Sequence, residues 1–217
     1  MENYHRSSYI GQVQFSGQRS LLGIENGRSL WESTYPRAYS QFVFKYAKQF
    51  DLPFELIWSI MRAESQYKKN VISPVGALGL MQVMPGTGKK ISQMLGEGSF
   101  VAEQLFEPES AIKIGSRYLQ RLLKKFDGSI PLVAASYNAG PHRVKAWLSS
   151  FGFLDLDEFI EHIPFLETRN YVKKVITNYS IYNSLYGNKK DTLASLAEAN
   201  QVRVTDGFAT KETWDDL

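Results

Sequence analysis

The chain has 217 residues, 43% of them hydrophobic, which is enough for one substantial core in a single domain with extensions. Its formal charge of +3 is too small to argue for a nucleic-acid partner, and the absence of cysteine excludes disulfides and thiolate metal sites. No apolar run approaches the roughly 20 residues of a membrane-spanning helix, so we expect no stable membrane insertion.

The first segment, residues 1–32, is polar and rich in glycine and serine, with isolated hydrophobic residues. We interpret it as an N-terminal extension without its own core. Its start, MENYHRSSYIGQVQF, lacks a basic region followed by an apolar region, so no secretory signal is visible. Either the protein stays inside the cell, or a signal was removed when this chain was made.

From Tyr35 onward the pattern is helical, because apolar residues recur at helical spacing. The first expected helix lies in YPRAYSQFVFKYAKQF. The second is expected to begin with Asp51 as N-cap and Pro53 in the first turn, and to run to about Gln66.

The rest of the domain is also predicted to be helical. We expect a helix from near Pro85 to near Gly96, and others in PESAIKIGSRYLQRLLKKF, IPLVAASYNAG, PHRVKAWLSSFG, DLDEFIEHI and PFLETRNYVKKVITNYSIYNSLYG. Segments with strand-like alternation are almost absent, so we predict one all-α domain over residues 33–187. The tail, residues 188–217, has helical propensity at TLASLAEAN and then loses its pattern.

Glu64 lies on the apolar stripe of the second predicted helix, where a carboxylate is unexpected. It follows Ile60 by four residues and Met61 by three, so it continues the face that Ile57 also lines. Burial there and the nearby helix C-terminus both disfavour a negative charge and would raise the pKa of the side chain. A carboxylic acid that keeps its proton near neutral pH can donate it to a leaving oxygen. The alternative is a glutamate at a helix end whose side chain reaches water.

Two further segments could complete a site around Glu64. The loop SPVGALGLMQVMP turns sharply at its glycine and proline residues and offers Ser73 and Gln82 as polar groups. The segment AASYNAG places Tyr137 and Asn138 at the end of a short apolar helix. In the functional interpretation, the hydroxyl of Tyr137 reaches the carboxyl of Glu64 and Asn138 binds substrate. In the structural alternative, the two are a core tyrosine and a helix-capping asparagine.

Four blocks, AESQY, SPVGALGLMQVMPGT, AASYNAGP and IPFLETRNYV, follow one another in an order and spacing that resemble the signature of the soluble lytic transglycosylases. These are lysozyme-like enzymes that cleave bacterial peptidoglycan. The resemblance covers residues 35–187 and implies an all-α, lysozyme-like fold, as in goose-type lysozyme. The third block has Ser136 where the family often has alanine, a change of one small residue for another.

The resemblance also implies roles for individual residues. Glu64 would be the single catalytic acid and base, Tyr137 would orient its carboxyl, and Ser65 would support the helix end. Other residues of the blocks would contact substrate, namely Ser73, Gln82, Met84, Asn138 and Glu167. For Arg169 and Tyr171 in the fourth block, a structural role and a functional role are equally open.

By the same resemblance, the reaction is cleavage of the β-1,4 bond between N-acetylmuramic acid and N-acetylglucosamine without water, which leaves 1,6-anhydromuramic acid ends. No metal or other cofactor is expected, and the three histidines, His5, His142 and His162, have no metal-ligand spacing. The expected partner is the glycan strand of peptidoglycan, which would place the enzyme in the periplasm or cell envelope.

Three alternatives stay open at this point. The chain could be a hydrolase similar to goose-type lysozyme, or a catalytically silent glycan-binding protein on the same fold. The N-terminal extension could also occupy the groove and hold the enzyme inactive.

Overall fold

The computed structural model describes residues 3–187, and within them the chain forms eleven α-helices, one 3₁₀-helix and isolated β-bridges in one loop. In chain order the elements are α1 (Tyr4–Val13), α2 (Ser16–Asn26), α3 (Arg28–Thr34), α4 (Ser40–Phe50), α5 (Phe54–Ser65), α6 (Pro85–Met94), η1 (Ala102–Phe106), α7 (Pro108–Lys125), α8 (Ile130–Ala139), α9 (Pro141–Phe151), α10 (Leu156–His162) and α11 (Leu166–Tyr186). The all-α prediction is confirmed for this part of the chain, whereas the helical propensity at TLASLAEAN lies outside the described residues.

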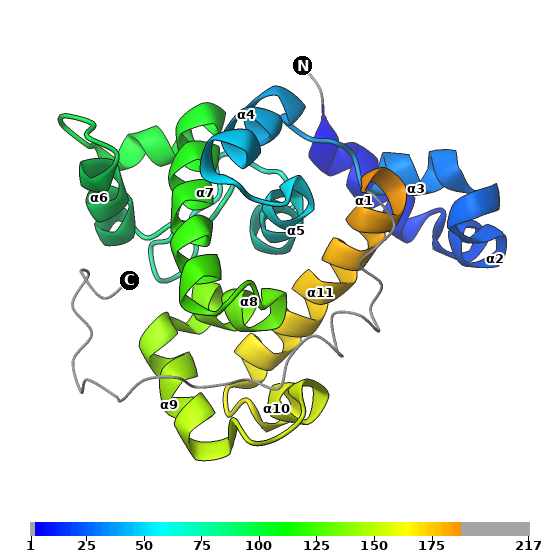
Figure 1. Ribbon diagram of the computed structural model, residues 1–217. Coiled ribbons are helices and arrows are strands. Elements are labelled where there is room, and N and C mark those ends of the chain that lie inside the picture. The colour runs from blue at the N-terminus through cyan, green and yellow to red at the C-terminus, as the bar shows by residue number, and fades with distance from the viewer. Residues whose placement is uncertain (1–2, 188–217) are drawn as a thin grey trace.

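Helix α5 is the centre of the core. Every residue from Glu55 to Ala63 is buried, and Trp58 is fully enclosed. In Figure 1, α5 lies near the middle of the molecule, with α4, α7, α8 and α11 around it. A helix that is buried on all its faces needs partners on every side, and α11 and α4 are two of those that pack against it.

The link between α4 and α5 differs from the prediction. Asp51 ends α4 in the left-handed conformation, with φ of 53° and its N–H bonded to the carbonyl of Ala47. Pro53 is the N-cap of α5 rather than a residue of its first turn. Only residues 51–53 separate the two helices, so Asp51 is used to end the first helix, and aspartate tolerates the left-handed conformation better than most residues.

Residues 4–34 form three helices that the sequence analysis did not predict. Their buried residues are not large hydrophobic ones but Ser8, Gly11 and Thr34. A Cβ atom on Gly11 would lie 2.1 Å from Oγ1 of Thr34, so the glycine lets α1 and α3 approach closely. Arg62 of α5 donates hydrogen bonds to the Ser8 hydroxyl and the Thr34 carbonyl. The segment is therefore attached to the face of α5 that carries Arg62.

Ser136 on α8 is fully buried, and its hydroxyl has no hydrogen-bond partner in the described part of the chain. Replacing an unsatisfied buried hydroxyl by hydrogen removes its desolvation cost. We therefore expect Ser136→Ala to raise the free energy of unfolding by about 1 kcal/mol, measured by urea denaturation. Ser59→Ala is the matched control, because the buried Ser59 hydroxyl donates to the carbonyl of Glu55 at 2.6 Å and its removal should bring no gain. A loss of stability in Ser136→Ala would contradict the prediction.

Candidate active site

Glu64 lies in the last turn of α5 and is half-buried between two buried neighbours, Ala63 and Ser65. The hydroxyl of Tyr171, on α11, donates a hydrogen bond to its Oε1 at 2.6 Å. Burial raises the pKa of Glu64 to about 7, against the opposing effects of the Tyr171 hydrogen bond and the positive charge of Lys174; the charge of Glu167 adds to the rise. Near neutral pH the carboxyl is thus divided between its protonated and ionised forms, as a group that both donates and accepts a proton requires.

The prediction that the hydroxyl of Tyr137 contacts the carboxyl of Glu64 is wrong. The hydroxyl of Tyr137 donates instead to the carbonyl of Met81 in the loop that follows α5, at 2.8 Å. Tyr137 still lies near Glu64, because the charge of that carboxyl, after burial, contributes to raising the pKa of Tyr137 well above its ordinary value. The tyrosine in contact with the carboxyl is Tyr171, for which the sequence left a structural and a functional role open.

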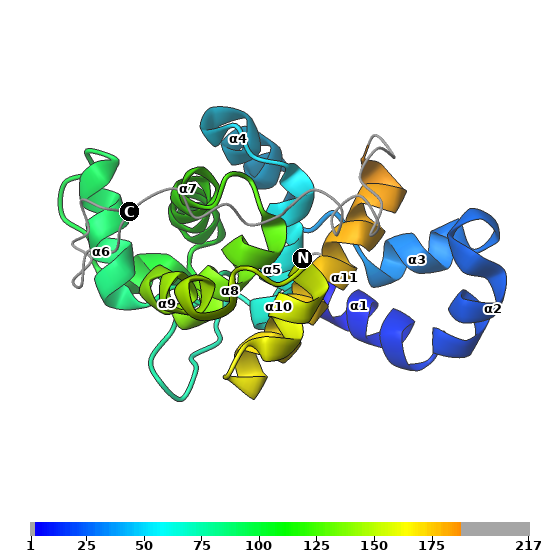
Figure 2. The ribbon, with the colours of Figure 1, turned by 60° about the horizontal axis from the view of Figure 1, so that its bottom comes forward.

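The loop between α5 and α6 is fastened to the end of α5. The hydroxyl of Ser65 donates to the carbonyl of Leu80 at 2.8 Å, and the side-chain amide of Gln82 donates to two carbonyls of the same loop. At Gly79, φ is +73° and a Cβ atom would lie 1.8 Å from the carbonyl oxygen of Leu105, so this position accommodates only glycine. Figure 2 shows the loop extending beyond the surrounding helices.

The predicted substrate residues of this loop are held in different ways. Ser73 is half-buried, and its hydroxyl oxygen accepts a hydrogen bond from the N–H of Ala77 at 2.9 Å. Met84 is exposed immediately before α6, with 43% of its surface accessible. Gln82 uses its amide N–H groups within the loop itself. Contact of these residues with substrate stays a prediction.

The two remaining predicted substrate residues lie at the junction of α8 and α11. Oδ1 of Asn138 accepts a hydrogen bond from the hydroxyl of Thr168 at 2.6 Å, which ties the end of α8 to the start of α11. Glu167 is exposed in the first turn of α11, four residues before Tyr171 and therefore on the same face of the helix. Its charge acts on Glu64, so the two carboxyls are neighbours. Their contacts with substrate likewise stay predictions.

Sequence reasoning missed Lys174, whose amino group donates to the carbonyl of Ala63 at 2.6 Å, next to Glu64. A signal was available, because Glu167, Tyr171 and Lys174 follow one another at intervals of four and three residues and so share one face of α11. Placing that face against Glu64 needed the packing of α11 on α5, which the sequence does not specify.

The Tyr171 hydrogen bond yields a direct test of this geometry. A bond donated to a carboxylate favours its charged form, so Tyr171→Phe should raise the pKa of Glu64 by about 1 unit above its value in the unchanged protein. Carbon-13 NMR titration of the glutamate carboxyls would measure the shift. Tyr137→Phe is the control and should leave the pKa of Glu64 nearly unchanged. If Tyr137→Phe raised the pKa of Glu64 and Tyr171→Phe did not, the orienting role first predicted for Tyr137 would be supported instead.

Comparison with known proteins places the chain in a family. A family model described as "Transglycosylase SLT domain" matches residues 41–160, and a second, "Soluble lytic transglycosylase helical domain", matches residues 162–191. The soluble lytic murein transglycosylase of Escherichia coli K12 is 40% identical over 174 residues, which are 78% of this chain and 27% of that protein.

Solved structures agree with this match. The crystal structure of the 70 kDa soluble lytic transglycosylase SLT70 from Escherichia coli has a TM-score of 0.73 and 34% identity, covering 90% of this chain and 32% of that one. An inactive mutant of the lytic transglycosylase Slt from Pseudomonas aeruginosa, in which a glutamate is replaced by glutamine, has a TM-score of 0.68 and 34% identity, covering 80% and 29%. The predicted lysozyme-like fold class is confirmed. The chain spans between a quarter and a third of the length of these relatives.

Proposed function

The chain belongs to the transglycosylase SLT family, and from this premise we propose that it cleaves peptidoglycan as a lytic transglycosylase. The bond cut is the β-1,4 bond between N-acetylmuramic acid and N-acetylglucosamine, and the product carries a 1,6-anhydromuramic acid end. The observation that supports this most is the shielded Glu64 carboxyl, with a pKa of about 7 and a hydrogen bond from Tyr171.

In the proposed reaction, Glu64 acts first as an acid. Its protonated carboxyl gives a proton to the oxygen of the scissile bond, and that bond breaks with the electron pair going to the leaving sugar. The substrate's own N-acetyl oxygen stabilises the positive charge left at C1. Glu64, now ionised, takes the proton from the C6 hydroxyl of the same muramic acid, and that oxygen closes on C1. The enzyme returns to its starting state, and no water is consumed.

The surroundings of Glu64 suit this sequence of steps. The protonated form is favoured by burial, so the acid is available near neutral pH. The ionised form that follows is stabilised by the Tyr171 hydroxyl and by the nearby positive charge of Lys174. Tyr171 therefore takes the orienting role that the family resemblance implied for Tyr137.

The hydrolase alternative needs a water molecule at C1 and commonly a second carboxylate to activate it or to act as nucleophile. Glu167 is the acid whose charge acts on Glu64, but it is exposed in the first turn of α11. Burial raises the pKa of Glu64, so this carboxyl can supply the proton itself, which favours the one-acid reaction.

Mass spectrometry of the products decides between the three functions. We expect digestion of purified peptidoglycan by this chain to release fragments with anhydro ends, each lighter by one water than the corresponding hydrolysis product. Reducing ends would instead support the lysozyme-like hydrolase. Binding without any product would support the silent glycan-binding protein. The same peptidoglycan, digested in parallel with a commercial muramidase, supplies the reference for reducing ends.

The proposed substrate also bears on location. Peptidoglycan lies outside the cytoplasmic membrane, so the proposed activity belongs in the periplasm or cell envelope. Among residues 3–187, none of the helices has the length and apolar character needed to cross a membrane.

The N-terminal helices bear on the autoinhibition alternative. Their hydrogen bonds to the rest of the chain include those from Arg62 and one between His5 and the carbonyl of Gln66. Arg62 precedes Glu64 by two residues, which is about 200° around a helix, so its bonds to Ser8 and Thr34 are on the side of α5 away from Glu64. This arrangement favours a supporting role for the segment over occupation of the groove.

A further inference from the structure

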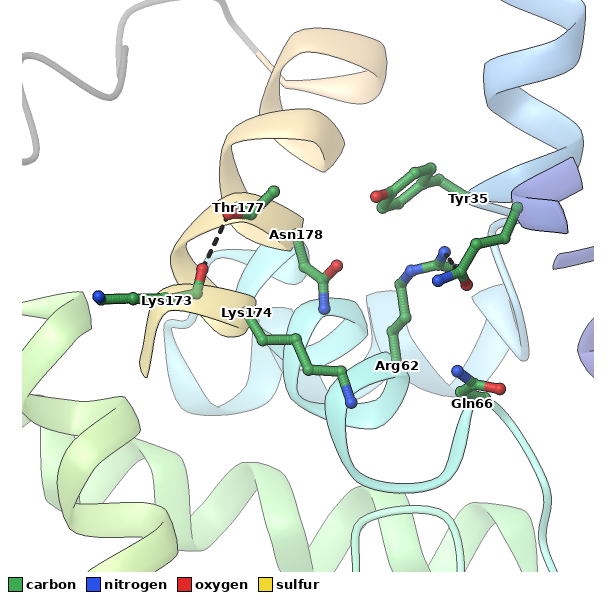
Figure 3. A pocket seen from close by; sticks show the side chains of 8 residues that line it. Tyr35, Arg62, Gln66, Lys173, Lys174, Thr177 and Asn178 are labelled. Atoms are coloured by element: carbon green, nitrogen blue, oxygen red, sulfur yellow. Dashed lines mark hydrogen bonds between the residues drawn. The ribbon is translucent and has the colours of Figure 1, made fainter. Parts of the chain in front are cut away.

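A cavity of about 310 Å³ lies between α1, α5 and α11. Its lining includes Gln12, Arg62, Gln66, Lys173, Lys174 and Asn178. Lys174 also lies next to Glu64, so the cavity adjoins the candidate active site. Figure 3 shows the guanidinium of Arg62, the amino group of Lys174 and the amide of Gln66 around its centre. A volume of this size is at the small end of ligand-binding pockets.

The cavity is positively charged, because three of its lining residues are basic and none is acidic. Lys173 forms an ion pair with Glu161 on the protein surface. Arg62 and Lys174 remain as the charges that act within the cavity. Positive charge in a concave site concentrates anions there.

Arg62 is a buried cation without a carboxylate partner in the described part of the chain. It is 5% exposed, and its guanidinium lies over the ring of Tyr35 at 3.9 Å. Its Nη1 and Nη2 atoms donate to neutral groups, namely the Ser8 hydroxyl, the Thr34 carbonyl, the Tyr67 hydroxyl and the Gln12 amide oxygen. The Nε–H takes part in none of these bonds. Burying an arginine among neutral partners is costly unless an anion completes the site.

Lys174 is the second cation. Its amino group donates one hydrogen bond, to the carbonyl of Ala63, and has two further protons to offer. Burial lowers the pKa of Lys174 against the opposing charge of Glu64. An anion in the cavity would offset that effect and hold the amino group in its charged form.

We propose that this cavity is a binding site for an oxyanion, either a carboxylate or a phosphate group, held between Arg62 and Lys174. Guanidinium and ammonium groups bind these oxyanions through charge-assisted hydrogen bonds. The amide of Gln66 adds a neutral donor. Two sources share this chemistry: a free anion such as phosphate, and a carboxylate on the peptide substituents of the glycan strand. The second source rests on the proposed function, whereas the first does not.

Occupation of the cavity has a consequence for Glu64. The charged and titratable groups that act on this carboxyl are Tyr171, Lys174 and Glu167 on α11 and Tyr137 on α8. The charge of Lys174 lowers the pKa of Glu64. An anion paired with Lys174 screens that charge, so Glu64 keeps its proton to a higher pH. The cavity would thus adjust the pH range over which the acid is available.

Titration of the full chain with inorganic phosphate tests the site without any substrate. Calorimetry should detect saturable binding, and the Arg62 Nε–H signal should shift in nitrogen-15 NMR. Lys174→Met should weaken binding by about tenfold or more, as expected for loss of one charge-assisted contact. Lys173→Met is the matched control, because it removes the neighbouring, paired lysine; it should leave binding within about twofold. Gln66→Ala should weaken phosphate binding less than Lys174→Met does. If Lys174→Met does not fold, Gln66→Ala is used instead.

A second experiment distinguishes the two sources. In a Glu64→Gln background, binding is measured to glycan strands with their peptides and to strands stripped of them by an amidase. If Lys174→Met weakens binding only of the peptide-bearing strands, the ligand is a substrate carboxylate. If Lys174→Met changes the binding of neither kind of strand but weakens phosphate binding, the ligand is a free anion. The proposal is overturned if Lys174→Met and Lys173→Met behave alike with phosphate and with both kinds of strand. Strands that do not bind at all would count against the proposed function, and the phosphate titration would still decide the site.

Discussion

Replacing Glu64 by glutamine is expected to lower kcat on peptidoglycan by about 1,000-fold or more, because one group supplies both the acid and the base. Glutamine has nearly the same shape, and its Oε1 can still accept the hydrogen bond from Tyr171. It has no acidic proton to give to the leaving oxygen and no negative charge to take one back. Release of soluble fragments from purified cell walls, followed by chromatography, measures the loss.

The control for this experiment is another acid of the same chain. Glu158 on α10 is exposed and lies outside the four blocks, so Glu158→Gln should keep at least about half of the activity. Glu64→Gln should continue to bind glycan strands, which separates loss of chemistry from loss of binding. Activity above about a tenth of the unchanged level would mean that another group supplies the proton. A wild-type chain that binds but does not cut would favour the silent glycan-binding alternative.

Most of the helices between residues 35 and 187 could be predicted from the sequence, because each combines helical spacing of apolar residues with a glycine or proline near its end. The long helix α11, for instance, was expected to close at Gly187 and ends at Tyr186. The three helices of residues 4–34 could not be predicted. Their large apolar residues are exposed or half-buried, and the contacts that hold them include Arg62 and the close approach at Gly11, which are tertiary.

The acid of the candidate site was also accessible from the sequence, although the reasoning was incomplete. Glu64 continues an apolar stripe, but α5 is buried all round, and Arg62 on the opposite face is buried too. The periodicity was interpreted as one apolar face, whereas the structure buries the helix on all its faces. What distinguishes Glu64 is that it is half-buried and accepts the hydrogen bond from Tyr171.

The partner of that acid was predicted incorrectly for a related reason. Tyr137 and Tyr171 both belong to the blocks that carry the family resemblance, and a sequence gives no distance between helices. The packing of α11 along α5 brings Tyr171 to the carboxyl, while the loop after α5 presents the Met81 carbonyl to Tyr137. Choosing between the two tyrosines required the three-dimensional arrangement.

Glu64→Gln, which is expected to remove activity, should also stabilise the protein at high pH relative to low pH. The pKa of Glu64 is about 7 in the folded protein against 4.5 for an ordinary glutamate, a difference of about 2.5 units. At 1.36 kcal/mol per unit, holding the ionised carboxyl in the folded state costs about 3 kcal/mol above pH 7. Because the folded pKa is raised, the stability linked to this proton is fully present below about pH 4.5 and is lost as the pH rises through 7. The glutamine side chain of Glu64→Gln does not ionise, so this variant does not lose that stability as the pH rises.

The measurement is the free energy of unfolding of Glu64→Gln minus that of the unchanged chain, from urea denaturation over a series of pH values. This difference should rise by about 3 kcal/mol between about pH 4 and about pH 8, whatever its starting value. A flat profile for Glu64→Gln would mean that the folded protein does not favour the protonated acid. The acid of the proposed mechanism would then lose its physical basis, because an ordinary carboxyl is ionised at neutral pH and has no proton to give.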